Sequence, residues 1–212
     1  MKIGVFGTGM VGSAIATKLV EVGHDVRMGS RTAGNEKAVA WTKAAGARAS
    51  EGTFADAAAF GELLFNCTSG GASLAALQAA GAANLGSKVL IDVSNPLDGR
   101  PPTLSVCNTD SLGEQLQRAF PDLKVVKALN TLTAPLMVNP SLLAGEHDVF
   151  MCGNDHAAKA KVSELLRGSF GWKNVVDLGD LSAARGQEMY VIFWVRMFGA
   201  LKSPMFNIHI VR

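Results

Sequence analysis

The sequence predicts an α/β fold of the Rossmann type, a doubly wound parallel sheet with a short C-terminal helical extension. Apolar segments of strand length alternate with segments of helical periodicity along most of the chain. A glycine-rich turn, Gly7-x-Gly9-x-x-Gly12, stands between the first such strand and the first helix. The 212 residues suffice for one domain. Strands that alternate with helices imply right-handed crossovers and a parallel sheet.

The individual elements follow from local patterns along the chain. Residues 89–93 form a nearly continuous apolar run, which is typical of a strand buried on both faces. Apolar residues recur at helical spacing in residues 13–22, and Gly23 then favours a helix end. A loop rich in Pro, Asn and Gly covers residues 95–103. The predicted strands are 2–6, 25–28, 63–67, 89–93, 125–129, 149–151 and 175–179, and the predicted helices are 13–22, 36–45, 74–83, 112–120, 157–166 and 182–198.

Composition excludes several classes of protein. Hydrophobic residues make up 48% of the chain, enough for a core, so intrinsic disorder is excluded. The net charge is +2 with no Lys/Arg-rich run, so we expect no nucleic-acid partner. Three cysteines predict neither a disulfide framework nor a metal site, and residues 1–7 leave no room for a signal peptide. We therefore expect a cytoplasmic protein without a metal.

The glycine turn is the main functional signal. Gly7 permits a tight turn, Gly9 lets the backbone approach a pyrophosphate, and Gly12 allows close packing of helix on strand. The N–H groups of Gly9, Met10 and Val11 then point from a helix N-terminus toward an anion. This context favours dinucleotide binding over a turn that binds nothing.

The end of the second strand indicates which dinucleotide binds. Sites that prefer NAD carry Asp or Glu there, but this strand ends with Gly29, Ser30 and Arg31. A hydroxyl and a guanidinium suit a 2′-phosphate, and Lys37 adds charge if residues 32–36 fold back. The alternative for Arg31 and Lys37 is a solvated surface cation. We predict NADP(H).

Loops after the later strands should surround the nicotinamide, because ligands of open α/β sheets bind at the carboxyl ends of strands. Each of these polar residues is also common in ordinary turns, which leaves that alternative open. The residues nominated are Thr68, Ser69, Asn95, Pro96, Asn130 and Thr131.

No catalytic acid or base stands out in the sequence. Lys127 is a candidate, but it lies within a predicted strand, where a structural role is favoured. Tyr190 falls in the apolar C-terminal helix and is better explained as core. The four histidines lack metal-ligand spacing. Hydride transfer between two redox rings needs mainly positioning, so this absence is consistent with such chemistry.

The residues beyond the nucleotide-binding core are few. We expect residues 1–171 to form the NADP-binding domain and residues 172–212 to form a strand and helix packed on it. The apolar stretch 189–201 contains Arg196 and is shorter than the ~20 residues that a bilayer requires. Residues 189–195 are hydrophobic on all sides, which predicts a buried helix and a homodimer formed through it.

Five segments together carry a resemblance to a known family. The sequence resembles the NADP oxidoreductases dependent on coenzyme F420, and is similar to the reductase domain of the STEAP-type metalloreductases. Of the five, the Gly-Ser-Arg turn and the Asp-x-Gly-x-Leu…Ala-Arg segment are the more specific. The segments are Gly7-Thr8-Gly9-Met10-Val11-Gly12, Gly29-Ser30-Arg31, Lys127-Ala128-Leu129-Asn130-Thr131, Cys152-Gly153-Asn154-Asp155 and 177–185.

The resemblance implies a small reductase that exchanges hydride between NADP(H) and a deazaflavin (F420) or flavin. It implies that residues 8–11, Ser30, Arg31 and Lys37 hold the NADP. The acceptor pocket would lie between the strand ends and a C-terminal segment that includes Trp194, Met197, Phe198, Met205 and Phe206. Two alternatives remain open: a non-catalytic NADP(H)-sensing module, and a small hydroxy-acid or imine dehydrogenase with a site shared between two chains.

Overall fold

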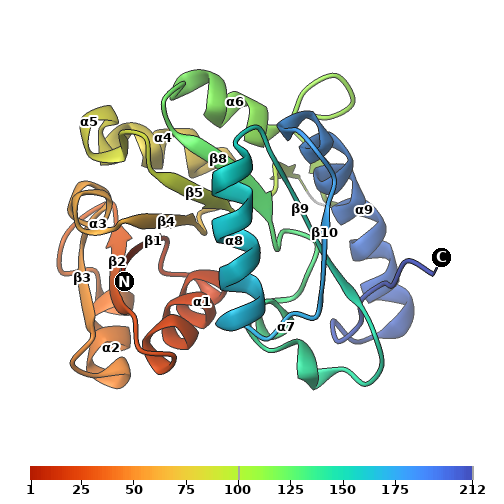
Figure 1. Cartoon of the computed structure of the whole chain (residues 1–212), viewed down its shortest axis with the longest axis horizontal. Coiled ribbons are helices and arrows are strands. Elements are labelled where there is room, and N and C mark those ends of the chain that lie inside the picture. The colour runs from red at the N-terminus through yellow and green to blue at the C-terminus, as the bar shows by residue number, and fades with distance from the viewer. Residues whose placement is uncertain (100, 212) are drawn as a thin grey trace.

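The computed structural model describes residues 1–99 and 101–211 and contains one eight-stranded sheet with helices on both faces (Figure 1). The strand order is β10-β9-β8-β5-β4-β1-β2-β3. A separate two-stranded hairpin pairs β6 (Leu97–Asp98) with β7 (Thr103–Leu104). The strands of the large sheet are β1 (Lys2–Phe6), β2 (Asp25–Ser30), β3 (Ala49–Thr53), β4 (Leu63–Asn66), β5 (Val89–Asp92), β8 (Lys124–Ala128), β9 (Asp148–Gly153) and β10 (Asn174–Asp177).

Helices divide between the two faces of the sheet. Apolar side chains of α1, α2, α7 and α8 pack into one cluster, and those of α3 to α6 pack into another on the opposite face. Side-chain caps start several of them, as where Thr53 and Asp56 form a reciprocal capping box. The helices are α1 (Met10–Glu21), α2 (Glu36–Ala45), α3 (Phe54–Phe60), α4 (Gly70–Ala80), α5 (Ala82–Leu85), α6 (Leu112–Ala119), α7 (Ala134–Val138), α8 (His156–Gly168) and α9 (Ala184–Leu201).

The predicted Rossmann-type fold is confirmed, but a sheet that is parallel throughout is wrong. Six strands, from β3 to β8 in spatial order, run parallel, whereas β9 pairs antiparallel with β8 and β10 follows β9. The reason is the connection after β8. It contains only short helices, and α7 packs against α1 instead of crossing the sheet. The chain therefore enters β9 from the edge at which it left β8.

The carboxyl ends of β1 and β4 form the topological switch point. The chain runs outward from β1 through β2 to β3, then returns to β4 on the other side of β1. Connections from these two strands leave toward opposite faces, so a crevice opens between them. This crevice positions the candidate site.

The long helix α9 lies on the side of the molecule far from β3, with the C-terminus beside it (Figure 1). Our expectation that residues 189–195 are buried is wrong for the single chain. Phe193 is 53% exposed and Met189 is 37% exposed, whereas Val191 is buried. One face of the helix packs against α6, β7 and residues 181–183, while Met189 and Phe193 stay exposed. No described helix is long and apolar enough to cross a membrane.

Candidate functional site

The glycine turn has the geometry of a pyrophosphate cradle. Gly7 has a φ of 115°, and a Cβ there would lie 2.7 Å from the carbonyl oxygen of Cys67. A Cβ on Gly12 would lie 2.1 Å from the carbonyl oxygen of Gly7. A Cβ on Gly9, in contrast, would meet nothing within 4 Å. The first and third glycines are therefore required by packing, while Gly9 leaves open space in front of the backbone.

That open space faces the N-terminus of α1. Gly9 caps the helix without a side-chain hydrogen bond, and the first intrahelical bond runs from the Ser13 N–H to the Gly9 carbonyl. The N–H groups of the first turn thus remain available to a ligand. Thr8 is half-buried and Met10 is 74% exposed at the rim of this cradle. Free N–H groups and a helix dipole together favour a phosphate.

The end of β2 lies beside the glycine turn. The Gly7 N–H donates to the Gly29 carbonyl at 2.9 Å, which places Ser30 and Arg31 next to the cradle. The Ser30 side chain is buried, and its hydroxyl donates to the Thr32 carbonyl at 2.6 Å, so it stabilises the turn that presents Arg31. Arg31 is exposed, and Lys37 is exposed in the first turn of α2.

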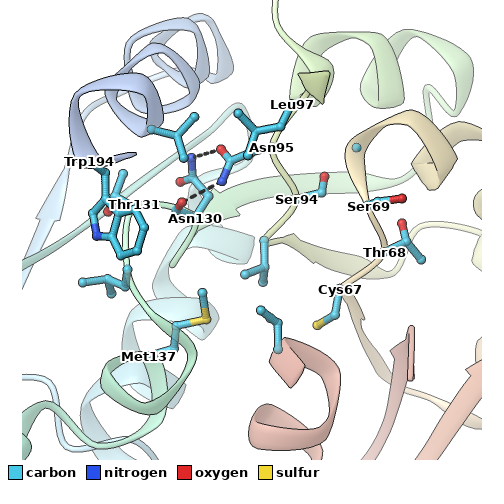
Figure 2. A pocket seen from close by; sticks show the side chains of 15 residues that line it. Cys67, Thr68, Ser69, Ser94, Asn95, Leu97, Asn130, Thr131, Met137 and Trp194 are labelled. Atoms are coloured by element: carbon cyan, nitrogen blue, oxygen red, sulfur yellow. Dashed lines mark hydrogen bonds between the residues drawn. The ribbon is translucent and has the colours of Figure 1, made fainter. Parts of the chain in front are cut away.

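Beyond the glycine turn, a pocket of about 280 Å³ lies at the carboxyl ends of β4, β5 and β8 (Figure 2). It brings together five of the nominated residues with Val11. Pro96 is buried but does not line the pocket. The lining residues are Val11, Cys67, Thr68, Ser69, Gly70, Val93, Ser94, Asn95, Leu97, Asn130, Thr131, Leu132, Met137, Val191 and Trp194.

A reciprocal amide pair fixes one wall of the pocket (Figure 2). The Asn95 side chain donates to the Asn130 carbonyl at 2.8 Å, and the Asn130 amide donates to Asn95 Oδ1 at 2.9 Å. The same Asn130 nitrogen donates to the Gln187 carbonyl at 3.1 Å and so ties α9 to this wall. Leu129, immediately before, has a φ of 66°, a backbone conformation that costs energy for such a residue. The turn after β8 is therefore held in one conformation.

The C-terminal segment contributes less to the pocket than expected. Val191 and Trp194 of α9 line it, whereas Met197, Phe198, Met205 and Phe206 do not. The indole of Trp194 stacks between the rings of Phe198 and Phe206, with centroids 5.7 and 5.3 Å away. These aromatic residues thus support Trp194 from behind.

Several buried polar atoms near this wall have no hydrogen-bond partner within the described ranges. They gather on α9 and on the turn after β8, beside the pocket. Such atoms are few in native structures, and each normally has a reason. The atoms are Asn130 Oδ1, both amide atoms of Gln187, the Tyr190 hydroxyl and Trp194 Nε1.

A buried charged network lies directly beneath the pocket. Lys127 Nζ contacts Asp92 Oδ2 at 2.8 Å, Glu188 Oε1 at 2.7 Å and the Ser94 carbonyl at 2.6 Å. Asp92 also accepts from the side chains of Ser94 and Asn66. All three ionisable side chains are fully or almost fully buried. The network ties α9 to β5 and β8 and was not predicted from the sequence.

The network fixes the charge of Lys127. Burial alone would lower the pKa of this lysine, but the facing charges of Asp92 and Glu188 outweigh that effect and raise the pKa. Its three protons are all donated within the network, so none is offered to the pocket. The structure thus agrees with a structural role for Lys127.

None of the residues that line the pocket is ionised. Burial raises the pKa of the Cys67 thiol, and the charge of Asp92 adds to this effect, so the thiol stays protonated. Burial likewise raises the pKa of Cys152 to about 12. The three cysteines are free thiols. Within the part of the chain that the structure describes, no group of three or more His, Cys, Asp or Glu could hold a metal.

The glycine cradle at the switch point and the pocket beside it define a dinucleotide-binding protein of the Rossmann class. The profile of the family described as "NADP oxidoreductase coenzyme F420-dependent" matches residues 2–96. A crystal structure from Arthrobacter sp. FB24, of a protein proposed to be an F420-dependent NADP-reductase, is 49% identical with a TM-score of 0.95. The two chains cover each other completely. The chain belongs to the family of NADP oxidoreductases dependent on coenzyme F420, and it is an NADP-dependent oxidoreductase.

Two further relatives differ more in length or in sequence. Metalloreductase STEAP3 of Rattus norvegicus is 33% identical over 192 residues, which are 88% of this chain and 36% of the relative. The chain therefore spans about a third of the length of this curated relative. A reductive aminase from Aspergillus terreus, solved with NADPH4, cyclohexanone and allyl amine, has a TM-score of 0.68 at 20% identity. That similarity covers 95% of this chain and 62% of the aminase and concerns the fold alone.

Proposed function

We propose that the protein transfers hydride between NADP(H) and a planar deazaflavin or flavin-like acceptor in the pocket of Figure 2. The observation that carries this proposal is the composition of the pocket. It adjoins the glycine cradle, and its lining offers amides, hydroxyls and apolar side chains but no ionised group. Bound NADPH supplies hydride from its nicotinamide ring. The protein's part is then to orient two rings and to exclude water.

Each wall of the pocket has a role in this proposal. The glycine cradle and the end of β2 hold the phosphates, with Arg31 and Lys37 on the 2′-phosphate and Ser30 beside them. Thr68, Ser69 and Asn95 orient the nicotinamide carboxamide from the ends of β4 and β5. Val11 of α1 and Met137 of α7 support the rings from one side, while Trp194 closes the side of α9.

The test is an anaerobic assay of NADPH oxidation with coenzyme F420, FMN, FAD and a quinone as acceptors. We expect turnover with a deazaflavin or flavin. Tight NADPH binding without turnover on any acceptor would instead support the non-catalytic sensing module, which the lack of an acid or base in the pocket also permits. No binding of NADPH at all would contradict the proposal as a whole.

We also propose that two copies of the chain associate through α9. On this helix Met189 and Phe193, one turn apart on the same face, are exposed, and Phe193 is 53% exposed. An apolar face of this kind on a folded chain usually marks an interaction surface. Phe193→Asp should convert a dimer to a monomer in light scattering, while a monomeric parent protein would contradict the proposal.

The three free thiols favour a reducing compartment such as the cytoplasm.

A further inference from the structure

The buried network under the pocket has a defined charge. Every contact that Asp92 makes is to a donor: Lys127 Nζ, Asn66 Nδ2, and the N–H and hydroxyl of Ser94. Glu188 accepts from Lys127 and from the N–H groups of Leu112 and Gly113, at 2.8 and 3.1 Å. Glu188 faces only N–H and ammonium donors, and Asp92 faces three such donors besides the Ser94 hydroxyl, so the ionised form of each carboxyl matches its contacts. Two carboxylates and one ammonium leave a net charge of −1 (−1 + 1 − 1).

This charge lies next to the place where the nicotinamide ring is proposed to bind. Asp92 is the last residue of β5, and the two residues that follow it, Val93 and Ser94, both line the pocket. The Ser94 hydroxyl donates to Asp92 at 2.6 Å, so a single side chain separates the carboxylate from the pocket. No lining residue is ionised and the network is 0–1% exposed, so water does not screen it locally. The N-terminus of α6, whose first two N–H groups bond Glu188, offsets part of the charge at that end of the network.

We propose that the Asp92–Lys127–Glu188 network is an electrostatic device that favours the oxidised nicotinamide over the reduced one. The oxidised ring carries a positive charge and the reduced ring is neutral, so a fixed negative charge beneath them discriminates between the two. The network thereby strengthens binding of NADP⁺ relative to NADPH and favours hydride donation by the bound reduced cofactor. This inference rests on the proposed binding of NADP(H) in the pocket.

The size of the effect follows from the interaction of two charges. At a separation on the order of 10 Å and an effective dielectric constant of about 20, one unit charge changes the relative affinity by about tenfold. Removal of one carboxylate charge should therefore reduce the preference for NADP⁺ by that factor. A purely structural role would weaken both nucleotides together and leave their ratio unchanged.

The experiment measures dissociation constants of NADP⁺ and NADPH by titration calorimetry for the wild-type protein and for Asp92→Asn, Glu188→Gln and Asp177→Asn. Asp177 is the matched control. It also pairs with a buried lysine, Lys159 at 2.9 Å, but it ends β10, which runs opposite to β5 and so ends at the other edge of the sheet. We expect the preference for NADP⁺ over NADPH, measured as the ratio of their dissociation constants, to fall about tenfold in Asp92→Asn and to fall also in Glu188→Gln. In Asp177→Asn this ratio should stay within twofold of the wild-type value.

Three results would overturn the inference. One is a ratio within twofold of wild type in both Asp92→Asn and Glu188→Gln while both nucleotides bind. Another is an equal shift in the control. If neither network variant folds, the dissociation constants of the wild-type protein provide the third test. Tenfold tighter binding of NADPH than of NADP⁺ contradicts a negative charge beneath the ring. Failure of the wild type to bind either nucleotide is a different result, since it contradicts the proposed function itself.

Discussion

Lys127→Met removes the cation that contacts both buried carboxylates, Asp92 and Glu188, and is expected to destabilise the fold strongly. Methionine fills the volume of the lysine stem, so the change tests charge more than packing. The side chains of Lys127, Asp92 and Glu188 are 0–1% exposed, so water cannot compensate the lost contacts. Breaking a buried pair by removing one partner typically costs about 3–5 kcal/mol. For a domain of this size that corresponds to a drop in Tm of about 6–20 °C.

The assay is urea unfolding at fixed protein concentration, followed by tryptophan fluorescence and far-UV circular dichroism. Lys159→Met is the matched control, because Lys159 is also buried but its partner Asp177 is 43% exposed and can be rehydrated. We expect the control to lose at most ~1 kcal/mol. If Lys127→Met loses less than ~1 kcal/mol of unfolding free energy, or if both variants lose the same amount, the two carboxylates of the network are not both charged.

Three further predictions concern the cradle, the specificity of the cofactor and the pH dependence of stability. Arg31→Ala should weaken NADPH about tenfold to a hundredfold and leave NADH unchanged in fluorescence titrations, because a charge-assisted phosphate contact is lost; equal effects would refute the assignment. Gly9→Ala should weaken the binding of NADPH without changing Tm, because a Cβ there meets no protein atom within 4 Å. Gly12→Ala should lower the free energy of unfolding by about 1–3 kcal/mol, because a Cβ there meets the Gly7 carbonyl. The hydrogen bond from Arg118 lowers the pKa of the Asp110 carboxyl to about 2. Because this folded pKa lies below the unfolded one, the pair stabilises the fold at pH values above the unfolded pKa, and the stabilisation is lost as the pH falls toward 2. Asp110→Asn should therefore lower Tm at pH 7 but not at pH 2 in calorimetry.

Most of the fold could be predicted from the sequence because its periodic segments are strong. Residues 36–45 were predicted as a helix and form one with those bounds, while most other elements differ by a few residues at their ends. The strand at 49–53 was missed because it carries no apolar alternation and is held at the sheet edge by backbone pairing with β2. The direction of β9 could not be predicted, since it depends on how the segment after β8 packs against α1.

The site was predicted in part, for reasons visible in its chemistry. Polar residues at strand ends indicate a pocket there. The pocket is indeed lined by Thr68, Ser69, Asn95 and Asn130. The network beneath it joins residues 35 and more positions apart, which no local pattern relates. One signal was present, because a carboxylate such as Asp92 inside an apolar strand requires a buried partner.

The most direct test of the proposed function follows deuterium from the nicotinamide to the acceptor. Each C4-deuterated diastereomer of NADPH is incubated with the protein and coenzyme F420, and the reduced deazaflavin is examined by mass spectrometry. A deazaflavin retains a hydride on carbon, so the label does not exchange with water. We expect one deuterium in the reduced deazaflavin from one diastereomer and none from the other. The proposed function would be contradicted if NADPH binds but transfers no deuterium to the deazaflavin and is not oxidised by any flavin.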